Sequence, residues 1–326
     1  MRIIKLIVFL SLCIFLGYFF FQFAPPGKSQ EEERFVIKID TPEVEIIDEL
    51  REKGLLRNKN IFNLILTLKN WHGKIESGAY QVSPNMNAYD LAKTLVSGPY
   101  QKWVVIPPGK RKEQVALILK KVLNWPDDMV FSFIRVAEEG YLYPDTYLIN
   151  VDFDPSQVFQ KLLGNFNEKF DAQLQKDLLA QNVRNDTAIK IATLIERESG
   201  GIEDKPEIAG IIFNRIARGM KLEIDATVQY AIASQQFAVS SKLASDFDFW
   251  PRLGSGIVRT IDSPYNTYLN KGLPPGPICS PSLESIKAVS HPAKTDALYY
   301  LHSSDKKIHT AKTLKEHEEN ITKYLE

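Results

Sequence analysis

One stretch decides the fold of the C-terminal half of the chain: Thr187-Ala188-Ile189-Lys190-Ile191-Ala192-Thr193-Leu194-Ile195-Glu196-Arg197-Glu198-Ser199. Its apolar residues recur with the spacing of an α-helix, so that Ile191, Leu194 and Ile195 share one face. Glu198 follows at the same spacing and continues this apolar face, whereas Glu196 lies off it. The stretch therefore predicts a buried helix that ends on a carboxylic acid.

Glu198 is a candidate general acid because of where this helix places it. A carboxylic acid on an apolar face loses hydration, which raises its pKa and keeps it protonated near neutral pH. An enzyme needs this protonation state to protonate a glycosidic oxygen. Helical spacing alone nevertheless favours a more ordinary alternative, in which Glu198 reaches solvent or caps a neighbouring loop, because helix ends carry many carboxylates.

The other polar segments carry weaker signals. Asp225 is more typical of a helix N-cap, and Asp145, which follows Pro144, is first of all a turn residue. No serine lies in the Gly-x-Ser-x-Gly setting of a hydrolase nucleophile. The loop 262–268 concentrates aromatic and amide side chains, as sugar-binding sites do, but a loop that packs its own tyrosines explains the pattern equally well.

Composition and charge narrow the class of protein. The 326 residues carry 40 Lys and Arg against 40 Asp and Glu, so the formal net charge is zero. This balance argues against a nucleic-acid-binding protein, which needs an excess of positive charge, but not against one that binds a polysaccharide. The five histidines are scattered and the two cysteines, Cys13 and Cys279, lack metal-ligand spacing, so no metal or other cofactor is expected.

The N-terminal run is long and apolar enough to cross a membrane. Counted from Ile3, it holds about 20 residues with little polarity. A cleaved signal peptide is the alternative, but large aromatics such as Phe21 and Phe23 fill the place of a small-residue cleavage site. Positive charge precedes the run and Glu31-Glu32-Glu33 follows it. We therefore expect residues 1–23 to form a single-pass anchor in the cell (inner) membrane, with a cytoplasmic N-terminus and a periplasmic or extracytoplasmic remainder.

Beyond a linker at 24–34, strands and helices alternate. Residues 35–100 have the pattern strand, helix, helix, strand, helix, followed by a strand at 103–106 and an amphipathic helix at 112–123. From Gly140 onward the chain is richer in helices. These are predicted within 157–179, 187–199, 205–218, 282–289 and 314–325, with a strand at 297–301. The sequence therefore predicts an α+β protein.

Several segments form an ordered set: EGYLYPDTY (139–147), IERES (195–199), IFNRIARGMKL (212–222), DATVQY (225–230), SPYNTY (263–268), GLPPGPI (272–278) and HPAKT (291–295). In their order and spacing these segments resemble the endolytic murein lytic transglycosylases, the YceG-like family. The resemblance covers the chain from the anchor to His309-Thr310. Two positions depart from the family pattern: Cys279 replaces a small residue, and Ala311 replaces an aromatic one.

The resemblance implies a fold and a reaction. A LysM-like module at 35–105 and a connecting segment at 106–139 would precede a helix-rich, lysozyme-like catalytic domain at 140–326. The second glutamate of the family's Glu-x-Glu motif is catalytic and corresponds to Glu198. The implied reaction cleaves the β-1,4 bond between N-acetylmuramic acid and N-acetylglucosamine within a glycan strand. The muramic acid 6-hydroxyl closes onto C1 to give a 1,6-anhydro end.

The resemblance also implies groove residues and partners. Tyr265, Asn266 and Thr267 are expected to line the groove, with Asp225 and Arg215 shaping it. The expected partners are peptidoglycan glycan strands, the peptidoglycan synthases whose nascent strands the enzyme would terminate, and the membrane, but no nucleic acid. Two alternatives stay open, namely a wall-binding scaffold that has lost catalysis and a hydrolytic muramidase.

Overall fold

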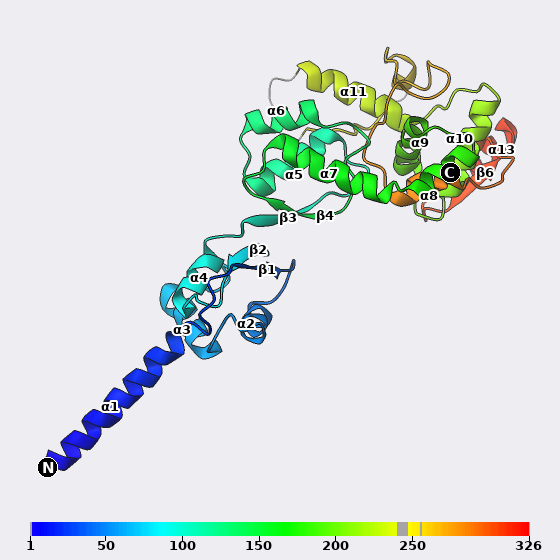
Figure 1. Ribbon diagram of the computed structural model, residues 1–326. Helices are drawn as coiled ribbons and strands as arrows, with labels where there is room; N and C mark the ends of the chain where they lie inside the picture. The colour runs from blue at the N-terminus through cyan, green and yellow to red at the C-terminus, as the bar shows by residue number, and fades with distance from the viewer. Residues whose placement is uncertain (1, 240–246, 255, 326) are drawn as a thin grey trace. The chain divides into compact units, whose positions relative to one another are not determined.

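The computed structural model describes residues 2–239, 247–254 and 256–325. The chain divides into two compact units (Figure 1). Unit 1 comprises Met1–Val104 and Tyr147–Phe153, and unit 2 comprises Val105–Thr146 and Asp154–Glu326. Residues 106–139, expected to be a connecting segment, contribute helices to unit 2, and residues 147–153, expected within the catalytic domain, belong to unit 1.

Unit 1 begins with the apolar helix α1, which spans Arg2–Phe23. Within it, Ile3–Phe23 is long and apolar enough to cross a bilayer, and its side chains are largely exposed. The predicted N-terminal apolar helix is therefore confirmed, and its use as a membrane anchor stays a prediction.

The remainder of unit 1 is a small sheet with helices packed against it. Its elements are β1 (Glu33–Ile37), α2 (Glu43–Glu52), α3 (Lys59–Lys69), β2 (Gly78–Val82), α4 (Ala88–Val96), β3 (Gln101–Val105) and β4 (Thr146–Asn150). The sheet order is β1-β2-β3-β4, and β1 pairs antiparallel with β2 so that Phe35 lies opposite Tyr80. Both rings are buried in a core with apolar residues of the three helices. Gly78 allows the close approach of β2 to β3, because a Cβ there would lie 2.5 Å from the Gln101 carbonyl oxygen.

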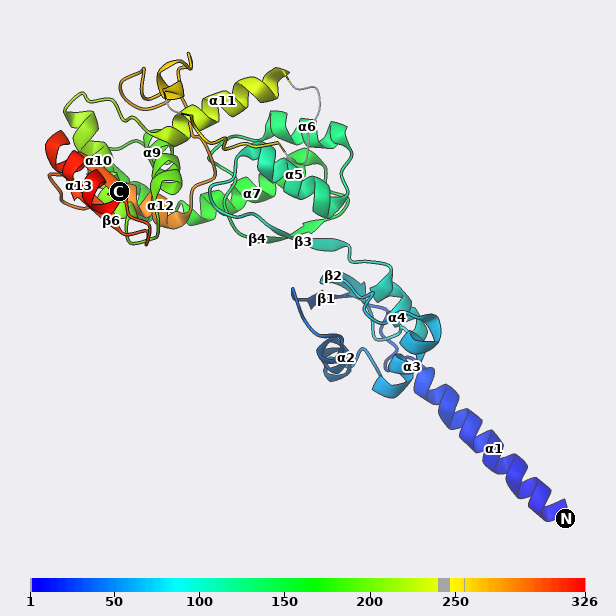
Figure 2. The same cartoon turned by 180° about the vertical axis from the view of Figure 1, so that it is seen from behind.

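Unit 2 is predominantly helical. Its elements are α5 (Lys112–Leu123), α6 (Asp127–Val136), α7 (Pro155–Lys169), α8 (Ala172–Ala180), α9 (Asn185–Glu198), α10 (Lys205–Ala217), α11 (Asp225–Val239), a 3-10 turn at Ile257–Arg259, α12 (Leu283–Ser290), β5 (Tyr299–His302), β6 (Ile308–Ala311) and α13 (Leu314–Tyr324). Helix α9 packs against α8, α10, α11 and α12 and is central to this unit (Figures 1 and 2). Ile191, Leu194 and Ile195 are buried on it, which confirms the predicted apolar face.

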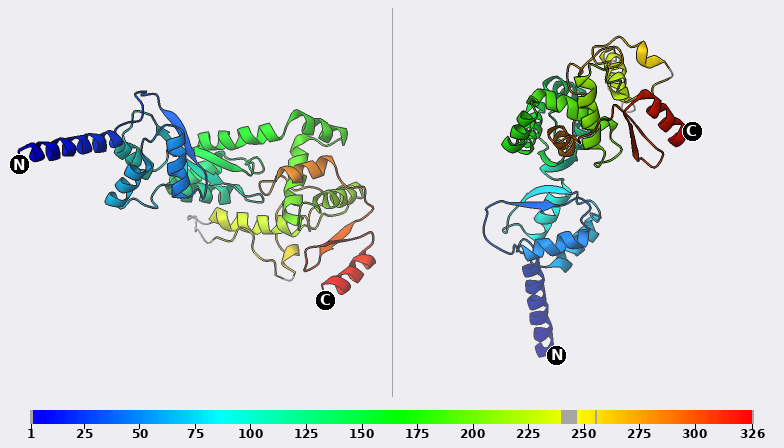
Figure 3. Two further views of the ribbon diagram at one scale, coloured as in Figure 1. Left: turned by 90° about the horizontal axis from the view of Figure 1, so that it is seen from below. Right: turned by 90° about the vertical axis from the view of Figure 1, so that its right-hand side faces the viewer.

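The C-terminal part of unit 2 is a hairpin backed by a helix. Strands β5 and β6 pair antiparallel, with Tyr300 opposite Thr310, and α13 packs on both strands (red in Figure 3). Thr313 caps α13 and forms a capping box with Glu316. The hairpin supplies the strand that reaches the end of α9.

Most predicted elements are confirmed within a few residues. Helix α5 has the bounds that its sequence predicts, and α9 begins two residues earlier than expected. Elements α6, β4 and β6 were not predicted, and α11 was indicated only by the suggested N-cap at Asp225. β4 was missed because Pro144-Asp145-Thr146 indicates a turn, and that turn leads directly into the strand.

Candidate active site

Glu198 is the last residue of α9, where the buried face of the helix meets the hairpin. The side chain is partly buried, and its Oε2 accepts a hydrogen bond of 2.6 Å from the Tyr300 hydroxyl. Leu194 and Ile195, one turn earlier on the same face, are fully buried. The carboxyl group therefore lies at the edge of the core, bonded to the hairpin, and its catalytic role stays a prediction.

The surroundings of Glu198 favour its protonated form. Burial raises the pKa of this carboxyl group, and the nearby Asp225 charge raises it further. Tyr300, His302 and Arg197 act in the opposite direction without cancelling the rise. Glu198 can therefore hold a proton at higher pH than an ordinary glutamate, as a general acid requires.

Glu196, one step earlier in the Glu-x-Glu pair, has opposite properties. Its Oε2 accepts hydrogen bonds from the hydroxyls of Ser282 and Ser285 at 2.6 Å, from the Ser282 N–H at 2.9 Å and from Lys205 Nζ at 3.1 Å. Burial alone would raise the pKa of Glu196, but these donors together lower it. Glu196 is therefore a charged anchor between α9 and the start of α12, unsuited to donating a proton.

Asp225 and Tyr268 form a pair beside Glu198. Asp225 is the first residue of α11 rather than its N-cap, and its Oδ1 accepts a 2.7 Å hydrogen bond from the Tyr268 hydroxyl. Burial raises the pKa of Tyr268, and Asp225 and Glu198 add to the rise. The hydroxyl is therefore neutral and donates to Asp225, which joins the loop 263–268 to α11 at the edge of the site.

Two of the expected groove residues are scaffold residues. Asn266 is fully buried, and its amide donates to the carbonyl oxygens of Val258 and Ile261. Thr267 is 2% exposed, and its hydroxyl oxygen accepts the Ile224 N–H. Because their polar atoms are used inside the protein, the expectation that these side chains line the groove is corrected: they shape the loop from within.

The remaining expected residues lie close to the core. The partly buried Tyr265 packs its ring on Tyr230, with centroids 4.8 Å apart. Burial raises the pKa of Tyr265, and the negative charge of Glu139 raises it further. Tyr265 therefore lies near Glu139. Arg215 is 9% exposed and donates to the carbonyl oxygens of Leu298 at 2.6 Å and Leu222 at 2.7 Å. It thus joins α10 to β5 and to the segment before α11.

The residues that contact or flank Glu198 were largely missed from sequence. Tyr300 lies 102 positions away, and its strand was predicted without any indication of which side chain would reach Glu198. Tyr268 belongs to a motif that was singled out, but its neighbours Asn266 and Thr267 were chosen instead. Arg197 stacks on Trp250, with the guanidinium carbon 3.9 Å from the ring centroid, and Trp250 Nε1 donates to Gln114.

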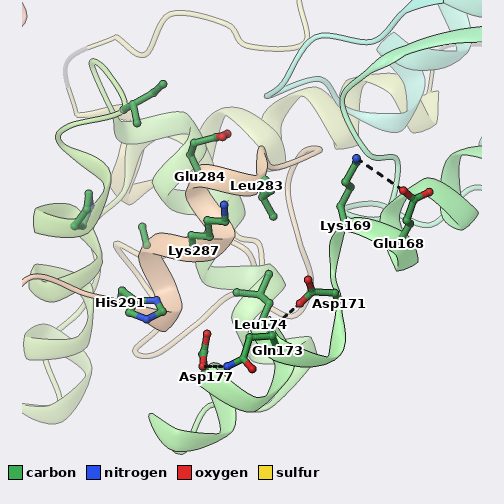
Figure 4. A pocket seen from close by; sticks show the side chains of 13 residues that line it. Glu168, Lys169, Asp171, Gln173, Leu174, Asp177, Leu283, Glu284, Lys287 and His291 are labelled. Carbon is green, nitrogen blue, oxygen red and sulfur yellow. Dashed lines mark hydrogen bonds and ion pairs between the residues drawn. The ribbon is translucent and has the colours of Figure 1, made fainter.

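A separate pocket of about 670 Å³ lies between α8 and α12 (Figure 4). Its lining includes the apolar Leu174 and Leu283 and the charged Glu284 and Lys287. Neither Glu198 nor the residues around it contribute to this lining. Among the described residues there is no group of three or more His, Cys, Asp or Glu side chains that could hold a metal ion.

Comparisons with known proteins identify a family and several relatives. A model of the YceG-like family matches residues 35–323. The chain is 26% identical over 369 aligned positions to a Streptococcus pneumoniae serotype 2 (strain D39 / NCTC 7466) protein named endolytic murein transglycosylase. This alignment covers 99% of the chain and 65% of the relative, so the chain spans about two-thirds of that protein's length or slightly less.

In two further matches the alignment covers a larger share of the similar protein. The chain is 28% identical over 311 positions to a Bacillus subtilis (strain 168) protein of the same name, covering 85% of this chain and 80% of the relative. The 2.6 Å crystal structure of a yceG-like protein from Listeria monocytogenes matches with a TM-score of 0.56 and 27% identity, covering 89% of this chain and 99% of that one.

Proposed function

The chain belongs to the YceG-like family, and we propose that it is an endolytic peptidoglycan lytic transglycosylase that uses Glu198 as acid and base. One observation carries the proposal: a partly buried carboxyl group with a raised pKa at the end of the central helix. The relatives named endolytic murein transglycosylase support the choice of peptidoglycan as substrate.

The first step is protonation of the leaving group. Glu198 in its acid form gives its proton to the glycosidic oxygen between N-acetylmuramic acid and N-acetylglucosamine. The bond from C1 to this oxygen breaks, the N-acetylglucosamine side leaves as an alcohol, and positive charge develops at C1. Glu198 is then a carboxylate, and Asp225 adds to the negative potential beside the developing cation.

The second step returns the proton to Glu198. The carboxylate takes the proton of the muramic acid 6-hydroxyl while O6 bonds to C1, which yields a 1,6-anhydro end and restores the acid. No water is consumed, so a single carboxyl group suffices. Glycosidases that hydrolyse the bond mostly use two carboxyl groups. Asp225, on the edge of the site, keeps a hydrolytic muramidase as the second candidate.

Unit 1 would bring the enzyme to its substrate. We assign residues 35–105 to a LysM-like wall-binding module, supported by the order β1, α2, α3, β2 with β1 and β2 antiparallel. Helix α1 would be a single-pass anchor of the cell membrane with the N-terminus in the cytoplasm, supported by its length and by Arg2 and Lys5 at its N-terminal end. A linker at 24–34 would separate the two, and the anchor would hold the catalytic domain, within residues 140–326, near nascent strands and the synthases that make them.

Product analysis tests the function. The full chain in detergent is incubated with purified glycan strands, and the products are weighed by mass spectrometry. Internal cleavage with anhydro ends, lighter than reducing ends by one water, is the expected outcome. Reducing ends would instead identify a hydrolytic muramidase. Intact strands that nevertheless bind the protein would identify a scaffold.

A further inference from the structure

Strand β5 directs two polar side chains toward the turn that follows α9. Tyr300 and His302 are two residues apart and so lie on one side of the strand, where their rings meet edge to face with centroids 6.1 Å apart. Tyr299 lies on the opposite side and stacks on His317 at 5.4 Å. The side of β5 that carries Tyr300 and His302 therefore faces the end of α9, where Glu198 lies.

Tyr300 holds one oxygen of Glu198 and leaves the other open. Its hydroxyl donates to Oε2 at 2.6 Å, and Tyr300 is the only side chain among the described residues that hydrogen-bonds this carboxyl group. A proton on Oε2 would compete with the Tyr300 proton for the same 2.6 Å contact, in which the hydroxyl is the donor. The hydrogen-bond arrangement therefore places the acid's proton on Oε1.

His302 fastens the same strand to the turn. Its Nε2 lies 3.0 Å from Asp204 Oδ2, and this carboxylate oxygen also accepts the Gly200 N–H at 3.2 Å. Gly200 packs closely against the hairpin, because a Cβ on Gly200 would lie 3.0 Å from His302 Cδ2 and 3.1 Å from the Lys306 carbonyl oxygen. The hairpin therefore rests directly on the residues that follow Glu198.

We propose that Tyr300 is a positioning residue for Glu198, which directs the acid's proton to Oε1 and stabilises the carboxylate formed when that proton leaves. The inference rests on the function proposed above. In the first step the Oε1–H bond breaks and the proton passes to the glycosidic oxygen. Tyr300 keeps its own proton, and its hydrogen bond to Oε2 becomes charge-assisted. In the second step the proton of the sugar hydroxyl returns to Oε1.

Electrostatics support this role. Burial raises the pKa of Glu198, and the Tyr300 hydrogen bond is the main influence that lowers it. The other charged or titratable groups around the carboxyl group come from every neighbouring element: His302 on β5, Asp225 on α11, Tyr268 in the loop 263–268 and Arg197 on α9. Removing the Tyr300 hydroxyl leaves all of these in place and should raise the pKa further.

The test is Tyr300→Phe in the full chain, assayed on glycan strands across about pH 5 to 9. Loss of one hydrogen bond to a charged group should lower kcat about 10- to 100-fold. The alkaline limb of kcat/KM, which reports deprotonation of the acid, should move to higher pH. Phenylalanine keeps the ring and its packing, so a purely structural role predicts no such movement.

The matched control is Tyr299→Phe, one residue away on the other side of β5, which should leave both the rate and the pH profile unchanged. A Tyr300→Phe profile that overlays the wild type, or equal effects of the two variants, would overturn the inference. Should Tyr300→Phe not fold, fluorotyrosine at position 300 provides the second measurement. It is a stronger donor, so the alkaline limb should move to lower pH, and an unmoved limb would again overturn the inference.

Glu198→Gln separates this inference from the function on which it rests. If Glu198→Gln still cleaves strands, the assignment of the acid fails. If Glu198→Gln is inactive and Tyr300→Phe behaves as the wild type, only the positioning role fails.

Discussion

Glu196 and Glu198 lie two positions apart on α9, and their environments on the two sides of the helix are opposite. Glu196 faces α12 and receives its four hydrogen bonds on one oxygen. Glu198 faces β5 and α11 and receives one, from Tyr300. Burial raises the pKa of both carboxyl groups, but the net shift is downward for Glu196 and upward for Glu198.

This difference shows that the number of hydrogen bonds donated to each carboxyl group, more than its burial, determines which glutamate can act as an acid. A carboxylate that accepts several hydrogen bonds is stabilised in its charged form, and its proton affinity falls. Lys205, 6% exposed, adds a positive charge on the Glu196 side. On the other side, Asp225 adds a negative charge beside Glu198. One helix turn thus carries a carboxylate that anchors α12 and a carboxyl group suited to donate a proton.

The largest expected effect is loss of cleavage in Glu198→Gln. Glutamine keeps the size of the side chain and can still accept from Tyr300, but it cannot donate a carboxyl proton, so kcat should fall about 10³- to 10⁴-fold. Release of anhydro ends from glycan strands, measured by mass spectrometry, checks this. If Glu198→Gln were active while Glu196→Gln was inactive, the roles assigned to the two sides of α9 would be reversed.

The next effect is on stability, in Glu196→Gln. An amide in place of the carboxylate leaves Lys205 buried without a counter-charge and offers its four donors only an uncharged, weaker acceptor, which should lower the free energy of unfolding by about 2–4 kcal/mol. Chemical denaturation at neutral pH measures it. Activity per folded molecule should stay close to that of the wild type, and a variant as stable as the wild type would contradict the anchoring role.

The sequence predicted the two faces of α9 but not their partners. Periodicity is a local property, so Ile191, Leu194 and Glu198 could be placed on one face. Three of the four donors to Glu196 belong to Ser282 and Ser285, 86 and 89 positions away, and no pattern within the chain joins such distant residues. The family resemblance, rather than periodicity, singled out Glu198 as the catalytic residue.

The error at Asn266 and Thr267 has a similar physical origin. Amides and hydroxyls in an exposed turn suit sugar binding, but they equally serve the carbonyl and N–H groups that an irregular buried loop leaves unpaired. Their side chains point inward and are used by Val258, Ile261 and Ile224. Sequence alone does not report which way a loop side chain points.

A third prediction concerns how stability depends on pH, because the two glutamates should contribute to this dependence with opposite sign. The depressed pKa of Glu196 contributes stability above the unfolded value of about 4.3, and this is lost as pH falls through the folded pKa. The raised pKa of Glu198 does the reverse: its contribution is present below about 4.3 and is lost as pH rises through the folded value.

Denaturation across pH distinguishes the two contributions. The deficit of Glu196→Gln relative to the wild type should shrink in acid. Glu198→Gln should be more stable than the wild type at neutral pH, by about 0.5–1 kcal/mol, because a group kept for function at a cost in stability has been neutralised. The same pH dependence in both variants would show that the two environments do not differ as described.

The last prediction concerns Gly200→Ala, which disturbs only the Glu198 side of the comparison. A Cβ there would lie 3.0 Å from His302 Cδ2 and 3.1 Å from the Lys306 carbonyl oxygen, so the hairpin must move by a few tenths of an ångström. This should cost about 1 kcal/mol of stability. It should also lower kcat a few-fold, because Tyr300 moves with the strand. Gly201→Ala is the matched control, since nothing lies within 4 Å of its Cβ. If the two alanine variants have equal kcat and stability, the hairpin does not control the geometry of Glu198, and the contrast between the two sides of α9 rests on the hydrogen bonds alone.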